Sequence, residues 1–420
     1  MRILFVTSRF LYPPDRGDKV RPWNFARALA GQHRLFSLSL SGQQVDPKRL
    51  HEACRIFEKA EYVVLPEWRA RLQMAAYYPS LRPVKLGAVR SAELHAKVRR
   101  RLRDWSIDLV YVFPYRMGCY LSESTDVFRI LDYCDAESVI MQRWMRCQPL
   151  MFQPIIYWEW LKMRRWEARV GADFDECWLI SAEDLDAVDG ALKGRAVVVP
   201  NGVDTDYFCP RPRADESKNL LFVGYMGAES LDAVEYFYNR VYPAVRSKEP
   251  EAKLYVVGAN PPDGLRALGE RDRSVVVTGF VDDLRDYYSQ AAVVVAPMRF
   301  VAGVQNKVLE AMAMQVPVVA TTYANEGIKG RPGQEIVIAD DPEEFASAVV
   351  SLLQSPEERR TIGRNARRFV RSNFSWAAAS ERVDLIAREV EASRGLAGPA
   401  QQAPPGMVSV GTLSGGGNAG

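Results

Sequence analysis

The chain has 420 residues, a length that favours two domains. Of these residues, 48% are hydrophobic and 25% are charged, a composition typical of a soluble globular enzyme. Its net charge of +3 does not indicate a nucleic-acid-binding protein, so we expect no nucleic acid among its partners. No apolar run approaches the ~18 residues of a membrane span, and the first residues, MRILFVTSRF, do not resemble a signal peptide. The six cysteines are scattered without a C-x-x-C pair, which favours reduced thiols in a cytoplasmic protein.

Short apolar runs alternate with helix-like segments along the first half of the chain. Such runs indicate buried strands of a parallel sheet whose two faces are covered by helices. The predicted strands are ILFVT (3–7), RLFSLSL (34–40), YVVLP (62–66), LVYVF (109–113), FRILDY (128–133), CWLIS (177–181) and AVVVP (196–200). The predicted helices fall at 21–30, 47–60, 90–104, 155–172 and 182–190.

The same alternation begins again after a stretch rich in Pro, Arg and Asp, CPRPRADESK (209–218). The sequence therefore predicts a second doubly wound α/β domain. Its predicted strands are NLLFVG (219–224), KLYVVG (253–258), VVVTG (275–279), VVVAP (293–297), VPVVAT (316–321) and EIVIA (335–339). Its predicted helices fall near 231–247, 283–290, 306–314 and 342–353.

These patterns divide the chain into four parts. We expect an N-terminal domain at 1–208 and a C-terminal domain at 209–375. A helix at 376–393 is expected to pack back across the two domains. The last segment, 394–420, is rich in Gly, Pro, Ala and Ser and has no charged side chain after Arg394, so we expect it to be disordered.

The stretch APMRFVAGVQNKVLEAMAMQVPVVATT (296–322) carries the clearest functional signal. It predicts the end of a strand, a loop containing Gly303, a helix from about Asn306, and a second strand. The first amides of such a helix lie at the carboxyl end of a parallel sheet, where they favour phosphate. Lys307 offers a cation to a phosphate, and Glu310 offers a carboxylate that can accept two hydrogen bonds from a ribose diol. The spacing alone fits an ordinary helical surface pair equally well.

Several stretches together resemble the GT-B glycosyltransferases of family 4, which transfer sugars from nucleotide donors with retention at the anomeric carbon. They are SRFLYPPDRGDKVRPWNFARAL near the N-terminus, VVVPNGVDTDYFCP (197–210), LLFVGYM, YVVGANP, VTGFVDDLRDYY and GVQNKVLEAMAMQVPVVAT (303–321). The resemblance spans residues 1–390 and implies an α/β fold of two Rossmann-like, doubly wound parallel-sheet domains facing a central cleft. The first domain would then lie on the acceptor side and the second would hold the donor. The segment QNKVLEAMAM (305–314) resembles the corresponding segment of a bacterial subgroup of sugar transferases linked to exopolysaccharide and PEP-CTERM/exosortase loci.

The resemblance also implies which residues bind the nucleotide-sugar donor. The family's E-x7-E pattern lacks its first Glu here, where Ala302 stands, so the contact of that Glu to the donor sugar comes from elsewhere or is absent. Gly279 begins a segment similar to the one that contacts the nucleobase, and Gly17 lets backbone approach a ligand. Either glycine could instead serve an ordinary turn. The donor-binding candidates are Gly17, Gly279, Phe280, Val281, Gly303, Val304, Gln305, Asn306 and Glu310.

Three residues are the candidates for catalysis. The Arg and Lys that commonly contact the diphosphate in this family are missing after the first strand of the second domain, so Arg299 and Lys307 are expected to supply the positive charge. Arg299 could instead be a solvated loop residue. The family often has a His near the sugar, and Cys134 stands at the equivalent position, which leaves the adjacent Asp135 as the polar group for the sugar or acceptor. The alternative role of Asp135 is a helix N-cap.

The implied reaction breaks the bond between the anomeric carbon and a nucleoside diphosphate. Helix amides around 303–306, with Lys307, would stabilise the charge that grows on the leaving diphosphate. In this family the leaving phosphate is thought to help deprotonate the acceptor, so a strong protein base is not needed. We expect no cofactor beyond the donor and no metal.

The sequence gives less information about the acceptor than about the donor. Residues 150–170 combine aromatic with basic side chains, which would suit an anionic inner leaflet that carries a lipid-linked acceptor. The same residues would equally fit an amphipathic helix packed in the core of the first domain. They include Trp158, Trp160, Lys162, Arg164, Arg165, Trp166 and Arg169.

We therefore expect a glycan or lipid-linked acceptor, with peripheral contact to the inner membrane as part of the hypothesis. Two other functions remain open. A nucleotide-sugar 2-epimerase-like enzyme would use the same fold, but it needs several carboxylates and a His near the sugar. A nucleotide-sugar-binding protein without turnover is consistent with Ala302.

Overall fold

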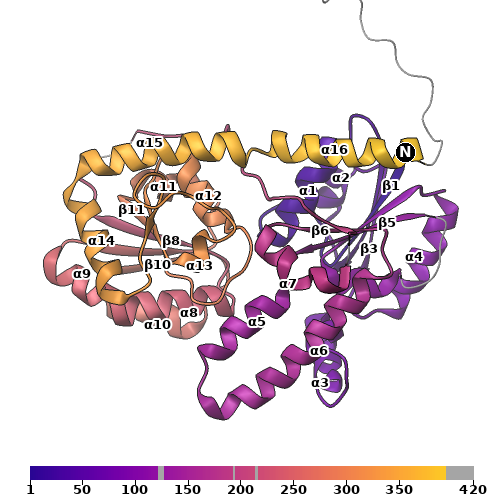
Figure 1. Cartoon of the computed structure of the whole chain (residues 1–420), viewed down its shortest axis with the longest axis horizontal. Coiled ribbons are helices and arrows are strands. Elements are labelled where there is room, and N and C mark those ends of the chain that lie inside the picture. The colour runs from indigo at the N-terminus through magenta and orange to yellow at the C-terminus, as the bar shows by residue number, and fades with distance from the viewer. Residues whose placement is uncertain (122–126, 193, 213–215, 394–420) are drawn as a thin grey trace, which may run out of the picture.

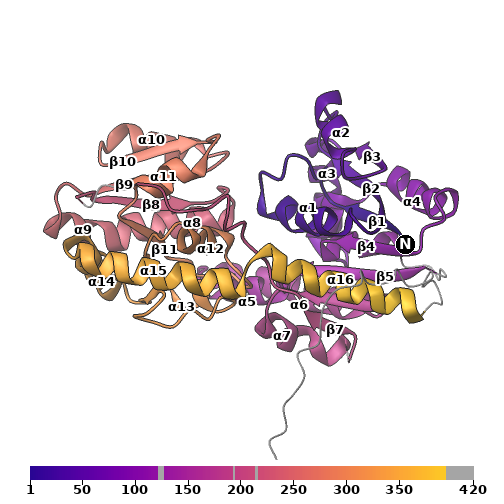
Figure 2. The same ribbon diagram turned by 90° about the horizontal axis from the view of Figure 1, so that it is seen from above.

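A computed structural model describes residues 1–121, 127–192, 194–212 and 216–393. It contains two α/β domains, each built on a parallel sheet with helices against its faces (Figures 1 and 2). The predicted architecture of two doubly wound, parallel-sheet domains is thus confirmed. The segment that we expected to be disordered, 394–420, lies outside the described residues.

The first sheet has seven parallel strands in the order β3-β2-β1-β4-β5-β6-β7. Its central strands are buried on both faces, and all five residues of β4 are buried, which explains the nearly unbroken apolar runs. The strand order reverses between β1 and β4, and such a reversal marks the ligand-binding edge of an open α/β sheet. The strands are β1 (Arg2–Thr7), β2 (Arg34–Ser41), β3 (Lys59–Val64), β4 (Leu109–Phe113), β5 (Phe128–Cys134), β6 (Glu176–Leu179) and β7 (Ala196–Val198).

The helices of the first domain include two that the apolar pattern did not predict, α3 and α5. In α3 no residue is buried, so it has no apolar stripe facing the domain core. Helix α5 and the longer α6 form a hairpin that projects from the domain (Figure 1). The helices are α1 (Gly17–Leu29), α2 (Pro47–Ala53), α3 (Glu67–Tyr77), η1 (Val84–Val89), α4 (Ala92–Asp104), η2 (Tyr115–Tyr120), α5 (Glu137–Arg146), η3 (Leu150–Phe152), α6 (Gln153–Gly171) and α7 (Ala182–Leu192).

The second sheet has six parallel strands in the order β10-β9-β8-β11-β12-β13, with the same reversal between β8 and β11. The strands are β8 (Asn219–Val223), β9 (Lys253–Val257), β10 (Val275–Gly279), β11 (Val293–Ala296), β12 (Val318–Ala320) and β13 (Val337–Ile338). The helices are α8 (Ala228–Tyr236), η4 (Phe237–Val241), α9 (Tyr242–Lys248), α10 (Asp263–Arg271), α11 (Leu284–Gln290), α12 (Asn306–Ala313), α13 (Thr322–Asn325), α14 (Pro342–Gln354) and α15 (Pro356–Asn373).

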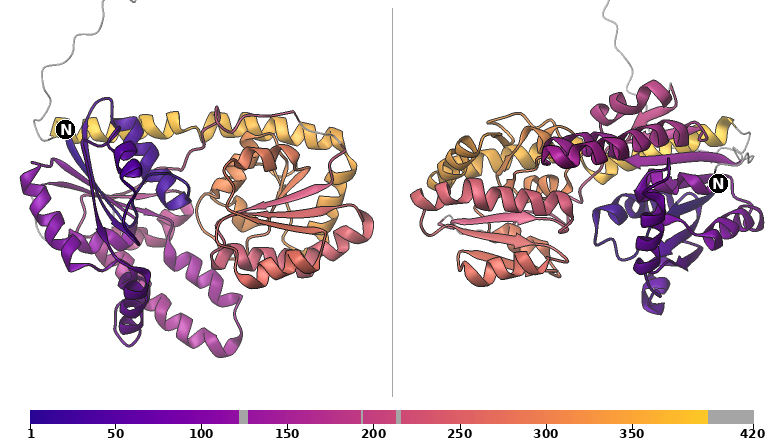
Figure 3. Two further views of the ribbon diagram at one scale, coloured as in Figure 1. Left: turned by 180° about the vertical axis from the view of Figure 1, so that it is seen from behind. Right: turned by 90° about the horizontal axis from the view of Figure 1, so that it is seen from below.

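The two domains are joined twice. The chain passes from β7 to β8 through the segment in which we placed the boundary, between residues 208 and 209. It returns through α16 (Trp376–Ser393), which follows α15 of the second domain and packs on α1 of the first (Figures 1 and 3). Val383 and Ile386 of α16 lie in the core of the first domain. Across the described part of the chain, no helix has both the length and the apolar character needed to cross a membrane.

Candidate active site

Gly303 lies at a close contact between the two domains. Its φ of +65° is in the left-handed region, which favours glycine. A Cβ at this position would lie 1.9 Å from Asp135 Oδ1 and 2.4 Å from Ile180 Cδ1, both in the first domain. The structure therefore brings together Gly303, a donor-binding candidate, and Asp135, and the glycine permits a close approach between the two domains.

The first turns of two helices, one from each domain, also meet at this interface. Helix α1 begins at Gly17 and α12 begins at Asn306, and a Cβ on Gly17 would lie 3.6 Å from Asn306 Nδ2. Next to them, the Arg16 guanidinium stacks 3.9 Å from the centre of the Tyr225 ring, just after β8. Because the first amides of a helix have no partner within it, this arrangement directs N–H donors from both domains to one region.

A buried chain of hydrogen bonds supports Asn306 from the first domain. Arg21 Nε pairs with Asp132 Oδ2 at 2.7 Å, and both side chains are almost fully buried. Arg21 Nη1 donates to Asn201 Oδ1 at 3.0 Å, and Asn201 Nδ2 donates to Asn306 Oδ1 at 3.2 Å. The amide of Asn201 therefore links the first domain to the start of α12.

Lys307 occupies an apolar position at the carboxyl end of the second sheet. Its Nζ lies 3.7 Å from Met298 Sδ and 4.8 Å from the centre of the Phe222 ring. Burial lowers the pKa of Lys307 to about 8, and the attraction of Glu229 and Glu310 only partly opposes this effect. At neutral pH the ammonium group is still mostly charged but is poorly solvated, which suits it to an incoming anion.

Glu310 lies on the same helix and is held by a tyrosine that the sequence analysis missed. Tyr288 donates from its hydroxyl to Glu310 Oε2 at 2.9 Å, and the same oxygen of Tyr288 lies 3.2 Å from the carbonyl of Lys307. Burial raises the pKa of Glu310 to about 7 against the lowering effect of Tyr288 and Lys307. Near neutral pH this carboxyl group is therefore ready to change its charge when a ligand arrives.

Asp135 follows β5 and does not have the capping role that we considered. The N-cap of α5 is Ala136, which forms no side-chain cap, and the Ala136 amide instead donates to Asp184 at 3.0 Å. Burial, together with the charge of Asp184, raises the pKa of Asp135 well above its usual range. A protonated Asp135 can donate a hydrogen bond to a sugar oxygen, and an ionised one can accept from a hydroxyl.

The segment at Gly279 ends β10, at the edge of the second sheet. Gly279 has a φ of +75°, and space is open around its Cβ position. Phe280 is 64% exposed, whereas Val281 packs partly against the core. An exposed aromatic ring at the carboxyl edge of the sheet is suitably placed to stack on a planar base. Val304 and Gln305 complete the loop before α12, with Gln305 at its N-cap.

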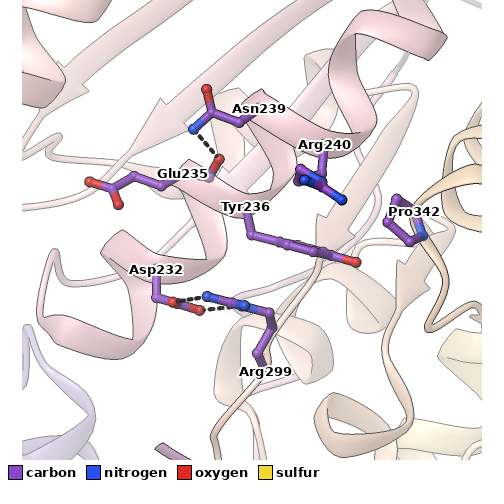
Figure 4. A pocket seen from close by; sticks show the side chains of 7 residues that line it. All are labelled: Asp232, Glu235, Tyr236, Asn239, Arg240, Arg299 and Pro342. Carbon is purple, nitrogen blue, oxygen red and sulfur yellow. Dashed lines mark hydrogen bonds and ion pairs between the residues drawn. The ribbon is translucent and has the colours of Figure 1, made fainter. Parts of the chain in front are cut away.

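Arg299 has a different environment from Lys307. Its guanidinium pairs with both carboxylate oxygens of Asp232 on α8, including a 2.8 Å bond from Nε to Oδ2. Figure 4 shows this pair beside the Tyr236 ring, in an open pocket of about 410 Å³ that Arg240 and other polar residues also line. The structure therefore holds Arg299 as an ion pair in a pocket of the second domain, and its charge is already matched.

Further polar contacts between the domains were not predicted, because their partners are far apart in the sequence. Arg143 of α5 binds both carboxylate oxygens of Glu326, at 2.8 and 2.7 Å, and also donates to the Val301 carbonyl. Lys329 pairs with Glu183 at 2.8 Å. Arg143 thus contacts the loop that carries Gly303, although nothing in its local sequence distinguishes it from other helical arginines.

The chain is similar to known proteins in sequence and in fold. Residues 217–355 match the family described as glycosyl transferases group 1. An uncharacterised 44.6 kDa protein in the cps region of Klebsiella pneumoniae is 24% identical over 89% of this chain and 96% of its own length. D-inositol 3-phosphate glycosyltransferase 2 of Catenulispora acidiphila is 31% identical over 51% of this chain and 56% of its own length.

Solved structures have the same fold along almost the whole chain. Sucrose-phosphate synthase from Thermosynechococcus elongatus aligns with a TM-score of 0.71 and 16% identity over 94% of this chain and all of its own. HepE from Anabaena, solved in complex with UDP, aligns with a TM-score of 0.66 and 15% identity over 93% of this chain and all of its own. The second domain therefore matches the group 1 glycosyl transferases over residues 217–355, and the chain shares its two-domain fold with these solved structures.

Proposed function

We propose that this protein transfers a sugar from a nucleoside-diphosphate sugar to a glycan or lipid-linked acceptor, with retention of configuration at the anomeric carbon. The main support for this proposal is that the first turns of α1 and α12 lie next to each other, beside the partly buried Lys307. A diphosphate placed there would be met by backbone N–H groups of both domains and by one ammonium group. The UDP complex of HepE supports a nucleotide donor. The name of the Klebsiella relative, in a cps region, supports a role in exopolysaccharide or cell-surface glycan synthesis.

The chemistry follows from where negative charge grows. When the bond from the anomeric carbon to the diphosphate breaks, the electron pair goes to the leaving phosphate oxygen. Lys307 has little solvation to lose, so its interaction with that oxygen strengthens as the charge develops. The resemblance to family 4 suggests that the same phosphate takes the acceptor proton. We propose that the reaction needs no metal, because Lys307 and the helix amides meet this charge.

Asp135 and Glu310 are assigned to the sugar and to the nucleoside. Asp135 adjoins Gly303 at the domain interface, so it would meet the sugar or the acceptor hydroxyl. Glu310 lies one helical turn beyond Lys307, where it would accept from the ribose with Tyr288 holding one of its oxygens. Arg299 would reach the diphosphate only after releasing Asp232, so we assign the main positive charge to Lys307.

The first experiment is calorimetric titration of the full chain with UDP, GDP and ADP. We expect selective binding of one diphosphate, weakened about 10- to 100-fold by Lys307→Met, since a hydrogen bond to a charged group contributes roughly 1.5–3 kcal/mol. Glu310→Gln keeps an oxygen for Tyr288 and should weaken nucleoside binding less than Lys307→Met. If no nucleotide binds, or if both variants bind as the unmodified chain does, the site assignment is wrong.

Turnover and stereochemistry need a second measurement. NMR of the matching sugar nucleotide incubated with the protein should show slow release of the sugar with its anomeric configuration kept. Inversion at C2 of the sugar would identify an epimerase-like enzyme. Tight binding without release, even with acceptor glycans present, would identify a nucleotide-sugar-binding protein without turnover.

A further inference from the structure

Exposed apolar side chains are concentrated in two segments of the first domain. Residues 150–158 expose six of them, and the tip at Leu150 and Met151 is 82% and 75% exposed. Residues 68–81 expose four more, including Trp68 at 65% and Leu81 at 77%. Together they are ten of the fifteen large hydrophobic residues that are exposed in the described part of the chain. Such a concentration marks an interaction surface, whereas exposed hydrophobic residues scattered singly do not.

The two segments are neighbours and point to the same side. Lys162 Nζ of α6 donates to the Tyr78 carbonyl at 3.4 Å, and the Val84 amide donates to Glu159 of α6 at 3.1 Å. Figure 1 shows α3 and the α5–α6 hairpin projecting from the lower side of the first domain, and the view from below in Figure 3 looks onto both. We refer to residues 68–81 and 150–158 together as the apolar patch.

The two halves of α6, the helix for which the sequence suggested either core packing or membrane contact, have different environments. In its second half, Lys162 is buried and bound to Glu159, and Trp166 packs partly against the domain core. In its first half, Ile155 and Trp158 are 51% and 45% exposed. The core-packing expectation therefore applies to the second half, which anchors the helix, and the first half carries apolar residues outward.

Positive charge surrounds the apolar patch. Arg69, Arg71 and Arg82 are exposed around its first segment, where the acid Glu67 pairs with Arg71 at 3.5 Å. Arg146, Arg164 and Arg165 are exposed around its second segment. Aromatic and aliphatic side chains bordered by arginines match the interface of a bilayer that contains anionic lipids, where each basic residue adds attraction.

We propose that the apolar patch docks the protein on the surface of an anionic bilayer, with the tip at 150–152 and the α3 side chains entering the headgroup region. Two separate projections that reach the same side of the molecule suit a flat surface better than a groove for one peptide. The inference about binding is independent of the proposed transfer reaction. Only the identity of the acceptor in that bilayer, a lipid-linked glycan, rests on the proposed function.

The position of the patch fits access to the candidate site. Asp135 lies two residues before α5, and the tip at 150–152 begins four residues after its last residue. Helix α5 has ten residues, so the bilayer surface would lie about 15 Å from Asp135 along this helix, at ~1.5 Å per residue. A saccharide on a lipid carrier spans such a distance without leaving the membrane.

The test is sedimentation of the full chain with vesicles of phosphatidylcholine alone and of phosphatidylcholine with phosphatidylglycerol in equal parts. We expect binding to the anionic vesicles, reduced by salt, and weakened at least ~10-fold by Leu150→Ser/Met151→Ser/Phe152→Ser, which removes three apolar side chains from the interface. Arg164→Glu/Arg165→Glu should reduce binding to anionic vesicles. Leu385→Ser changes an exposed leucine on α16, outside the patch, and should bind as the unmodified chain does.

Three results would overturn the proposal. The chain could stay in solution with anionic vesicles at low salt, or the triple variant could bind them as well as the unmodified chain. Sedimentation velocity could show a dimer that the triple variant disperses, without vesicle binding, which would assign the patch to a second copy of this chain. Because vesicle binding is scored without nucleotide, it can succeed when the titration with UDP, GDP and ADP fails, and the reverse also holds.

Discussion

Gly303→Ala tests whether the close approach of the two domains matters for the reaction. The new Cβ would lie 1.9 Å from Asp135 Oδ1 and 2.8 Å from Ile180 Cγ1, well inside ordinary contact distance, so these side chains or the domains that carry them must move. A displacement of ~1 Å between reacting groups can cost ~100-fold in rate. We therefore expect turnover, measured as nucleoside diphosphate release from the donor, to fall about 100-fold.

The same substitution also strains the backbone, and Gly333→Ala measures that part alone. Gly333 has a φ of +73°, close to the +65° of Gly303, but its Cβ position has open space. An alanine in this region costs about 1–2 kcal/mol, so urea unfolding should show that loss in Gly333→Ala and at least as large a loss in Gly303→Ala, where the clash with the first domain adds to it. Turnover should remain unchanged in Gly333→Ala.

Comparison of the two variants shows whether the close approach of the domains at Gly303 affects turnover. If Gly303→Ala and Gly333→Ala lose the same stability and both keep full turnover, the close approach of Asp135 to the donor loop plays no part in the reaction. A Gly303→Ala variant that binds the selected nucleoside diphosphate normally but releases no product would place the effect on domain approach and not on donor affinity.

Further predictions concern the charges of the site. The pKa of Lys307 is lowered to about 8 from 10.5, so the unfolded chain holds its proton up to higher pH than the folded one, and this lysine lowers stability below about pH 8. Lys307→Met should therefore raise the free energy of unfolding at pH 7 by on the order of 1–3 kcal/mol in chemical denaturation while it weakens donor binding. In the unmodified chain the affinity for the diphosphate, followed by calorimetry, should fall as pH rises through about 8, because the ammonium loses its proton. A pH-independent affinity would remove Lys307 from the site. Treatment with EDTA should leave turnover unchanged, and a loss that Mg²⁺ restores would contradict the proposed metal-free reaction.

The strands could be predicted from the sequence because they are short apolar runs, and central strands such as β4 and β11 are buried on both faces of a parallel sheet. Helix α15 was missed although its buried face carries Ile362, Ala366 and Val370 at helical spacing, because arginines fill much of the sequence between them. The small size of Gly363 has a packing reason, since a Cβ there would lie 2.2 Å from the Gln315 carbonyl.

The candidate site could be predicted only where its residues are consecutive. The loop and helix from Gly303 to Glu310 form one local unit, and local patterns predict such units. The partners of these residues lie elsewhere: Tyr288 is 22 residues from Glu310, and Asp232 is 67 residues from Arg299. Spacing in one sequence contains no information about such pairs, so the matched charge of Arg299 became visible only in the fold.

Helix α5 connects the candidate site with the apolar patch, and separate variants can distinguish their two proposed roles. Arg143, in its last turns, holds Glu326 and the Val301 carbonyl across the interface, and its side chain is 12% exposed. We expect Arg143→Ala to lower turnover about 10-fold or more without changing vesicle binding, because a largely buried charged hydrogen bond contributes roughly 1.5–3 kcal/mol. Lys329→Ala is the control: it also breaks an ion pair between domains, but Lys329 is 62% exposed, so its effect should stay within ~1 kcal/mol.

The triple variant at 150–152 should show the opposite behaviour to Arg143→Ala. It should release product from a soluble donor as the unmodified chain does, because its side chains are exposed beyond the end of α5 and the domain interface stays intact. If it instead slows this release in the absence of vesicles, the tip of the hairpin affects how α5 holds the donor loop. Docking and domain approach would then be one coupled event, and the separation of roles along α5 would be wrong.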